Sequence, residues 1–215
     1  MATKPASKRQ RAGGDGPTVR QRILEAAFAA FMKDGYAATS TLAIATRARV
    51  SKRELYAVVG TKEEMLVACI TERARRLEAP ADLPEPRDRD MLATLLTTFG
   101  AQLLREVTDP TVVGVFRLAI GEALHAPEVA MVLDSVGRGA SRAALRKIMI
   151  QACSSGLLEG HPAEISQQFA ALLFGDVMMD LLLQTTKRPT QEEMETRARN
   201  AVTALLRLHP VRTGA

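Results

Sequence analysis

Positively charged side chains stand in the first turn of several predicted helices near the N-terminus. Lys52 and Arg53 follow Ser51, a residue type that often caps a helix start, and Arg20 and Lys62 hold similar places in two other helices. At an exposed site the helix dipole disfavours such a cation by about 0.3–1 kcal/mol. A bound phosphate would reverse this effect, because free backbone N–H groups and the cation would share the anion. One such cation is ordinary solvated charge, whereas three helix starts of this kind indicate a surface that binds a polyanion.

The excess positive charge of the chain lies in its first third. The net charge is +5, and residues 1–66 hold twelve Lys and Arg but six Asp and Glu, a surplus of six. Residues 67–215 hold seventeen basic and eighteen acidic side chains, which nearly cancel. A basic unit joined to a near-neutral body suggests a head that binds nucleic acid and a trunk that binds a partner or a ligand.

The composition is typical of a folded protein in a reducing compartment. The chain has 215 residues, of which 47% are apolar and 25% charged, and this balance differs from that of disordered chains. No stretch reaches the roughly 18 uninterrupted apolar residues of a membrane helix. Cys69 and Cys153 lie far apart and fit neither a disulfide framework nor a metal site. We therefore expect a cytoplasmic protein.

The residue types that enzymes use do not occur in a catalytic arrangement. His125, His161 and His209 lie in separate parts of the chain. No Ser-His-Asp order, metal-ligand spacing or glycine-rich phosphate loop accompanies them. We therefore expect no catalytic residue, no metal and no cofactor, and we predict that the chain is not an enzyme.

The hydrophobic pattern is helical throughout, which predicts an all-α fold with about nine helices. Thr18 and Gln21 have the spacing of a capping box, and Gly35 is a typical helix stop. The proline-rich stretch 79–86 cannot continue a helix and is the best candidate boundary between head and trunk. After the first helix, further helices are expected near 41–48, 52–58, 62–78, 88–107, 110–124, 127–155, 162–186 and 190–208.

The segments 41–48 and 52–58 are too short to be stable helices on their own. A helix-turn-helix explains them, because both can pack with the first helix while the second projects its outer face into the major groove. The apolar residues expected in this small core are Leu42, Ile44, Ala45, Val50 and Leu55.

Residues 18–66 resemble the DNA-binding domain of the TetR/AcrR family of bacterial transcriptional regulators. The resemblance extends without a gap over TVRQRILEAAFAAFMKDGYAATSTLAIATRARVSKRELYAVVGTKEEML. It implies a homodimer that binds a palindromic operator and releases it when a small molecule enters the C-terminal domain. The resulting division is a flexible basic arm over 1–17, a DNA-binding domain over 18–66, and a ligand-binding and dimerisation domain over 67–215.

The resemblance also implies roles for individual residues. In the recognition helix, Arg53 or Lys52 can donate to guanine and Glu54 can accept from cytosine, although Glu54 can equally serve only as a cap. Tyr56 is either a phosphate contact or a core residue. The positions carried over to phosphate contacts or base edges are Thr39, Ser40, Thr41, Ser51, Lys52, Arg53, Glu54, Tyr56 and Lys62.

Arg49 departs from the family pattern, because it stands where a turn glycine is usual. If Arg49 has a positive φ, the strain costs about 1–2 kcal/mol. We predict that Arg49 accepts the strain because it reaches a phosphate or base, although a different turn is the alternative. The arm residues Lys4, Lys8, Arg9 and Arg11 either enter the minor groove or form a disordered tail with a nonspecific pull on DNA.

The trunk more loosely resembles the AefR-like branch of the family, in the stretches 116–129 and 174–183. Its scattered methionines and few aromatic residues favour an acyl-like or irregular hydrophobic ligand over a planar one. A buried Arg117 must be paired or face a cavity, so it either pairs with Asp176 or joins it in holding an effector. The residues expected to line the pocket are Phe99, Phe116, Arg117, Ile120, Met149, Gln151, Phe169 and Asp176.

The helices near 162–186 and 190–208 are the predicted dimer interface, because the first is apolar around most of its circumference. A twofold axis there would set two recognition helices about 34–36 Å apart. The helix over 62–78 would then couple ligand binding in the trunk to operator binding by the head. The favoured function is a ligand-released repressor. The alternatives are a ligand-dependent activator and a helical ligand-binding or scaffolding protein without specific DNA binding.

Overall fold

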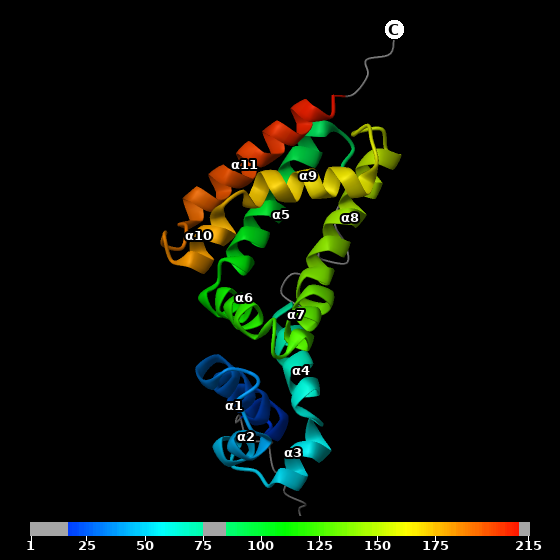
Figure 1. The fold of residues 1–215 in the computed structure, drawn as a ribbon. Coiled ribbons are helices and arrows are strands. Elements are labelled where there is room, and N and C mark those ends of the chain that lie inside the picture. The colour runs from blue at the N-terminus through cyan, green and yellow to red at the C-terminus, as the bar shows by residue number, and fades with distance from the viewer. Residues whose placement is uncertain (1–16, 75–84, 211–215) are drawn as a thin grey trace, which may run out of the picture.

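The protein is elongated, with two groups of helices stacked end to end (Figure 1). The structure is a computed structural model and describes residues 17–74 and 85–210. All regular secondary structure in these residues is helical, which confirms the all-α prediction. The head contains α1 (Val19–Asp34), α2 (Thr41–Ala48), α3 (Lys52–Val58) and the start of α4 (Lys62–Ala74). The trunk contains α5 (Arg89–Val107), α6 (Pro110–Glu122), α7 (Pro127–Val132), a π-helix (Leu133–Arg138), α8 (Gly139–Ser154), α9 (Pro162–Phe174), α10 (Val177–Leu183) and α11 (Gln191–Leu208).

Local sequence signals fix the ends of the head helices. The Thr18 hydroxyl accepts from the Gln21 N–H, and the Gln21 side chain accepts from the Thr18 N–H, so the predicted capping box is confirmed. Thr61 and Glu64 form an equivalent box at the start of α4. Gly35 ends α1 with a φ of 83°, a conformation that disfavours any residue with a Cβ atom.

The helix-turn-helix core contains most of the predicted residues. Ile44, Ala45 and Leu55 are buried, and Val50 packs against them from the turn. The prediction for Leu42 is wrong, because its side chain is 62% exposed. α2 buries the face formed by Ile44, Ala45 and Ala48, and Leu42 lies outside this face.

Helix α4 joins the head to the trunk through one continuous hydrophobic cluster. Met65, Cys69 and Ile70 are buried on α4, and the cluster continues from α1–α3 into α6, α7 and the π-helix. The proposed boundary between 66 and 67 stays a prediction. The proline-rich stretch 79–86 lies mostly outside the described residues.

A second hydrophobic cluster fills the far end of the trunk, between α5, α8, α9 and α11. Arg89 at the start of α5 closes this end. Its guanidinium donates to the carbonyls of Leu157, Leu206 and His209 at 3.0, 2.6 and 2.9 Å. These contacts hold the C-terminal end of α11 against α5.

Two of the predicted trunk helices are interrupted. The segment expected at 127–155 contains the π-helix Leu133–Arg138, in which an added Cβ at Gly137 would lie 3.0 Å from the Leu133 side chain. The segment expected at 162–186 breaks at Gly175, which has a φ of 44° and lies against the Arg197 guanidinium. α9 and α10 therefore meet at a bend of 49°. Among the described residues, no single helix is long and apolar enough to cross a membrane, and this bent pair qualifies only when its two helices are joined.

Candidate nucleic-acid interface and trunk cavities

Helix α3 presents almost its whole surface to solvent. Leu55 is its one buried residue, at 0% exposure, and fixes the helix to α1 and α2. Lys52, Arg53, Glu54 and Tyr56 are all exposed. A short helix with a single buried contact and a charged outer face is suited to binding an external partner.

Ser51 is the N-cap of α3, and its hydroxyl accepts from the Glu54 N–H at 3.0 Å. The Glu54 side chain does not return this bond to Ser51, so the box is only half formed. Within the described residues the exposed Glu54 carboxylate has no hydrogen-bond partner. Its side chain is therefore free to accept a hydrogen bond from outside, whereas its N–H performs the capping.

Tyr56 and Thr41 lie together at the surface where α2 and α3 meet. Their hydroxyl oxygens are 3.3 Å apart, and Tyr56 is 43% exposed. The alternative that Tyr56 belongs to the core is therefore wrong. The Lys52 ammonium lies 5.9 Å from the centre of the Tyr56 ring, so one cation and two hydroxyls share this surface.

The three hydroxyl residues before and at the start of α2 have different surroundings. Ser40 is exposed and caps α2 by accepting from the Ala43 N–H at 3.1 Å. Thr41 is half-buried at the same surface. Thr39 is 5% exposed, and its hydroxyl donates to the Gly35 carbonyl at 2.6 Å. Thr39 thus stabilises the turn after α1, and its hydroxyl is not presented to a phosphate.

Arg49 has a left-handed conformation in the turn between α2 and α3. Its φ and ψ are 56° and 49°, so of the two turns that the sequence left open the structure has the one with a positive φ. Its side chain is exposed, and its guanidinium forms no hydrogen bond or ion pair with any described residue. The guanidinium is therefore able to reach a partner beside α3.

Lys62 is half-buried, and its charge is used within the head. Its ammonium donates to the carbonyls of Tyr36, Thr39 and Ala37 at 3.0, 3.3 and 3.4 Å. It also lies 4.5 Å from the centre of the Tyr36 ring. The structure therefore gives Lys62 an internal role, holding the α1–α2 loop. Of the predicted helix-start cations, Arg20, Lys52 and Arg53 remain exposed.

Tyr36 lies buried beneath this lysine. Burial raises the pKa of Tyr36 to about 12, and the nearby carboxylates of Glu128, Glu63 and Glu122 act in the same direction. The phenol is therefore neutral at physiological pH. The predicted arm residues Lys4, Lys8, Arg9 and Arg11 lie outside the described residues.

The trunk has an apolar cavity of about 60 Å³ between α4, α5, α6 and the π-helix. A polar cavity of about 290 Å³ adjoins it at the junction of head and trunk. Glu106 and Val112 line both. The apolar walls of the smaller cavity are formed by Ile70, Val107, Val112, Val115, Phe116 and Leu133.

Of the predicted pocket residues, only Phe116 lines the apolar cavity. Phe99, Met149 and Phe169 are buried in the second hydrophobic cluster, where they fill the core between α5, α8, α9 and α11. Ile120 is 62% exposed, and Gln151 lines neither cavity. These side chains therefore do not line one cavity, because three of them fill the core of the second cluster and Ile120 faces solvent.

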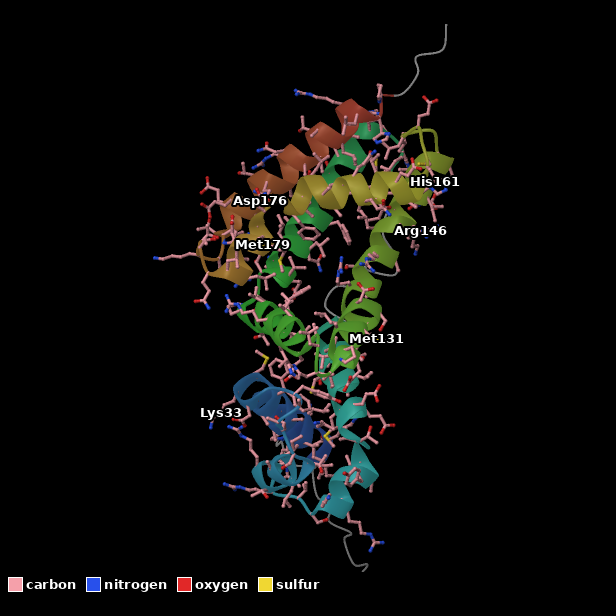
Figure 2. The ribbon with its side chains drawn as sticks, viewed as in Figure 1. Lys33, Met131, Arg146, His161, Asp176 and Met179 are labelled. Atoms are coloured by element: carbon pink, nitrogen blue, oxygen red, sulfur yellow. The ribbon has the colours of Figure 1, made fainter. Side chains whose placement is uncertain are left out.

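Arg117 and Asp176 do not meet either. The Arg117 guanidinium donates to the carbonyls of Leu181 and Leu182 at 2.6 and 3.1 Å, at the C-terminal end of α10. Asp176 is exposed at the opposite end of α10 (Figure 2). Arg117 thus satisfies the last carbonyls of a helix, which corrects both the ion pair and the shared ligand role.

Two family models match this chain. Residues 23–69 match the N-terminal domain of bacterial regulatory proteins of the tetR family. Residues 94–209 match the C-terminal domain of AefR-like transcriptional repressors, and this match covers more than half of the chain. The chain belongs to the TetR family.

Known members support this assignment over most of the molecule. The transcriptional repressor Rv3405c of Mycobacterium tuberculosis is 31% identical over 142 residues, which are 63% of this chain and 68% of that protein. A TetR regulator from Agrobacterium tumefaciens is 26% identical with a TM-score of 0.74, covering 90% of this chain and 95% of its own. The flavonoid-responsive regulator FrrA is 27% identical with a TM-score of 0.77, covering 91% and 98%.

Membership in the TetR family fixes the general function. The protein is a DNA-binding transcriptional regulator with an AefR-like C-terminal domain. Regulators of this family are not enzymes, in agreement with the prediction from the sequence. Sequence reasoning missed most of the lining of the apolar cavity, and it missed Glu122, whose carboxylate accepts from the Ala37 N–H. No local signal marks these residues, because each acts on an element distant in the chain.

Proposed function

We propose that this TetR-family regulator is a homodimeric repressor that binds a palindromic operator through α3 and releases it when a small hydrophobic effector enters the trunk. The observation that carries this proposal is the exposed face of α3. Lys52, Arg53 and Glu54 are exposed there, while Leu55 alone fixes the helix. Such a helix can enter the major groove without unpacking the head.

The side chains around α3 have the donors and acceptors that DNA requires. Arg53 or Lys52 donates to guanine O6 and N7, and Glu54 accepts from cytosine N4. Tyr56 on α3, with Ser40 and Thr41 at the start of α2, contacts phosphates, which position the helix without reading sequence. Arg49 adds a cation at the other side of the turn.

The proposed dimer interface lies on α9, α10 and α11. A groove between α9 and α11 combines the apolar residues Leu172, Ala201 and Ala204 with polar side chains of α11, namely Glu192, Glu193, Thr196, Arg197 and Asn200. Met179 and Leu183 on the neighbouring α10 are 58% and 65% exposed. The exposed apolar side chains Leu172, Met179 and Leu183, next to polar groups of α11, suit a second copy related by a twofold axis. That axis would place the two α3 helices about 34–36 Å apart, one turn of DNA.

The apolar cavity is the proposed effector site. Its apolar lining is aliphatic apart from Phe116, and Glu106, Arg138 and Ser141 add polar groups to the lining. The adjoining polar cavity gives an effector room to extend past Glu106 and Val112. One structural neighbour is described as flavonoid-responsive, which supports a small hydrophobic effector without identifying it.

Selection from a pool of random duplexes tests the proposal. The full chain should enrich an inverted repeat whose half-sites are about one helical turn apart. Enrichment of a single half-site would contradict the dimeric arrangement. Binding that shows no sequence preference at any salt concentration would favour a helical scaffolding protein instead.

A further inference from the structure

A carboxylate of the trunk forms a hydrogen bond with the backbone of the α1–α2 loop in the head. Glu122 is the last residue of α6, and its carboxylate accepts from the Ala37 N–H at 3.1 Å. Glu122 and Ala37 are 85 positions apart in the chain. The contact therefore depends entirely on how the trunk sits on the head.

Gly35 makes this approach possible. A Cβ atom at this position would lie 2.8 Å from the Glu122 carboxylate oxygen, and the φ of Gly35 is 83°. A larger residue would be strained in itself and would also press on Glu122. The loop is thus shaped to admit the carboxylate.

The same helix forms part of the effector site. Val112, Val115 and Phe116 of α6 line the apolar cavity, and Phe116 precedes Glu122 by six residues, about 9 Å along a helix. An α-helix of this length moves as one body. A displacement of α6 at the cavity therefore moves the carboxylate that holds the loop.

The loop in turn leads directly into Ser40 and Thr41. The Lys62 ammonium holds the backbone of the loop from the head side, and the Glu122 carboxylate holds it from the trunk side. Removal of the Glu122 carboxylate leaves the Ala37 N–H exposed to water and the loop held from one side only.

We propose that Glu122 is a positioning residue for operator binding: its carboxylate sets the α1–α2 loop so that Thr41 meets a phosphate. This inference rests on the proposed function, because it requires that the protein binds a specific operator. It assigns Glu122 no contact with DNA, because it acts through Ala37 and the loop.

The test is a double-mutant cycle on a duplex selected by the wild-type chain. Glu122→Ala removes the acceptor, and Thr41→Val removes the hydroxyl while keeping the side-chain shape. We expect each single change to weaken operator binding roughly three- to tenfold, as for the removal of one hydrogen bond. The double variant should bind the operator as tightly as the single variant with the lower affinity, because both changes remove one and the same phosphate contact.

Two further variants separate positioning from a general loss of structure. Glu122→Gln keeps an oxygen that can accept from the Ala37 N–H, so it should restore most of the affinity. Glu164→Ala removes an exposed carboxylate on α9 and should leave operator binding unchanged. Hydrogen exchange should accelerate at residues 36–41 in Glu122→Ala and stay as in wild type in α11.

The outcomes distinguish this proposal from the proposed function. Effects that multiply in the double variant, or wild-type affinity in Glu122→Ala, would overturn the positioning role while operator binding by the wild-type chain stands. Failure of the wild-type chain to bind any selected duplex would overturn both.

Discussion

Lys62 and Glu122 bind the two backbone polar groups of one residue, Ala37. The Lys62 ammonium donates to the Ala37 carbonyl at 3.4 Å, and the Glu122 carboxylate accepts from the Ala37 N–H at 3.1 Å. One residue begins α4 and the other ends α6. The loop that precedes the DNA-facing surface is thus fixed jointly by the helix that joins head to trunk and by a helix that walls the proposed effector cavity.

Neutralising Lys52 and Arg53 together should weaken operator binding and reduce its dependence on salt. Removing one phosphate contact lowers the slope of log affinity against log salt by about 0.9, and removing one base contact costs about 1–3 kcal/mol. Fluorescence anisotropy at several salt concentrations measures both. The matched control is Arg146→Gln with Lys147→Gln, which removes two exposed charges from α8 on the trunk (Figure 2). An equal change in slope for both pairs would show that only overall charge matters.

Replacing Arg49 by glycine should stabilise the folded chain but weaken operator binding. The left-handed conformation at a φ of 56° costs a non-glycine residue about 1–2 kcal/mol. Glycine removes this strain, but its greater freedom in the unfolded chain offsets about 0.4–1 kcal/mol of the gain in stability. Thermal unfolding and operator titration of Arg49→Gly measure the two effects. Unchanged operator affinity would mean that the arginine does not contact DNA.

The buried phenol of Tyr36 should make the protein less stable in alkali. Its pKa is raised to about 12 in the folded chain and is about 10 when unfolded. The unfolded chain therefore releases this proton first, and the free energy of unfolding falls as the pH rises from about 10 to about 12. The ultraviolet absorbance of tyrosinate in Tyr56→Phe isolates Tyr36, since the chain has two tyrosines. Ionisation of Tyr36 near pH 10 while the helices remain folded would contradict the burial.

A charge at Leu172, an apolar residue of the groove between α9 and α11, should prevent dimerisation. Leu172 lines this groove, and Leu172→Glu would place a carboxylate against the partner's apolar side chains, where an unpaired charge is costly. Light scattering at micromolar concentration should report a monomer. Met131→Glu is the control, because Met131 is 68% exposed on α7, away from the groove (Figure 2). A dimeric Leu172→Glu would place the interface on another face.

Phe169 and Phe116 should respond differently to truncation. Phe169 is fully buried in the second cluster, so Phe169→Ala should lose about 3–5 kcal/mol of stability. Phe116 is half-buried beside a cavity, so Phe116→Ala should lose clearly less. Melting at fixed protein concentration compares them. Equal losses would argue that Phe116 is an ordinary core residue.

The head was largely predictable because its determinants are local. Thr18 with Gln21 and Ser51 with Glu54 are three residues apart, and the caps that they form lie where the sequence places them. Arg49 in a glycine position likewise marked the turn where the structure shows a positive φ. Backbone conformation at such sites depends on neighbours in the chain, so the helices and their order follow from sequence.

Whether a given side chain is buried, paired or exposed depended on elements far away in the chain. In the sequence Lys62 resembles a free cation, but in the structure it binds the carbonyls of the loop at 36–39. Arg117 resembles a ligand-binding or ion-pair residue, but in the structure it binds carbonyls at the end of α10. The break at Gly175 and the position of the apolar cavity have the same origin. The sequence by itself determined a helical DNA-binding head on a helical trunk. Only the tertiary structure decided which charges face outward, because burial and pairing are settled by helices that meet across the fold.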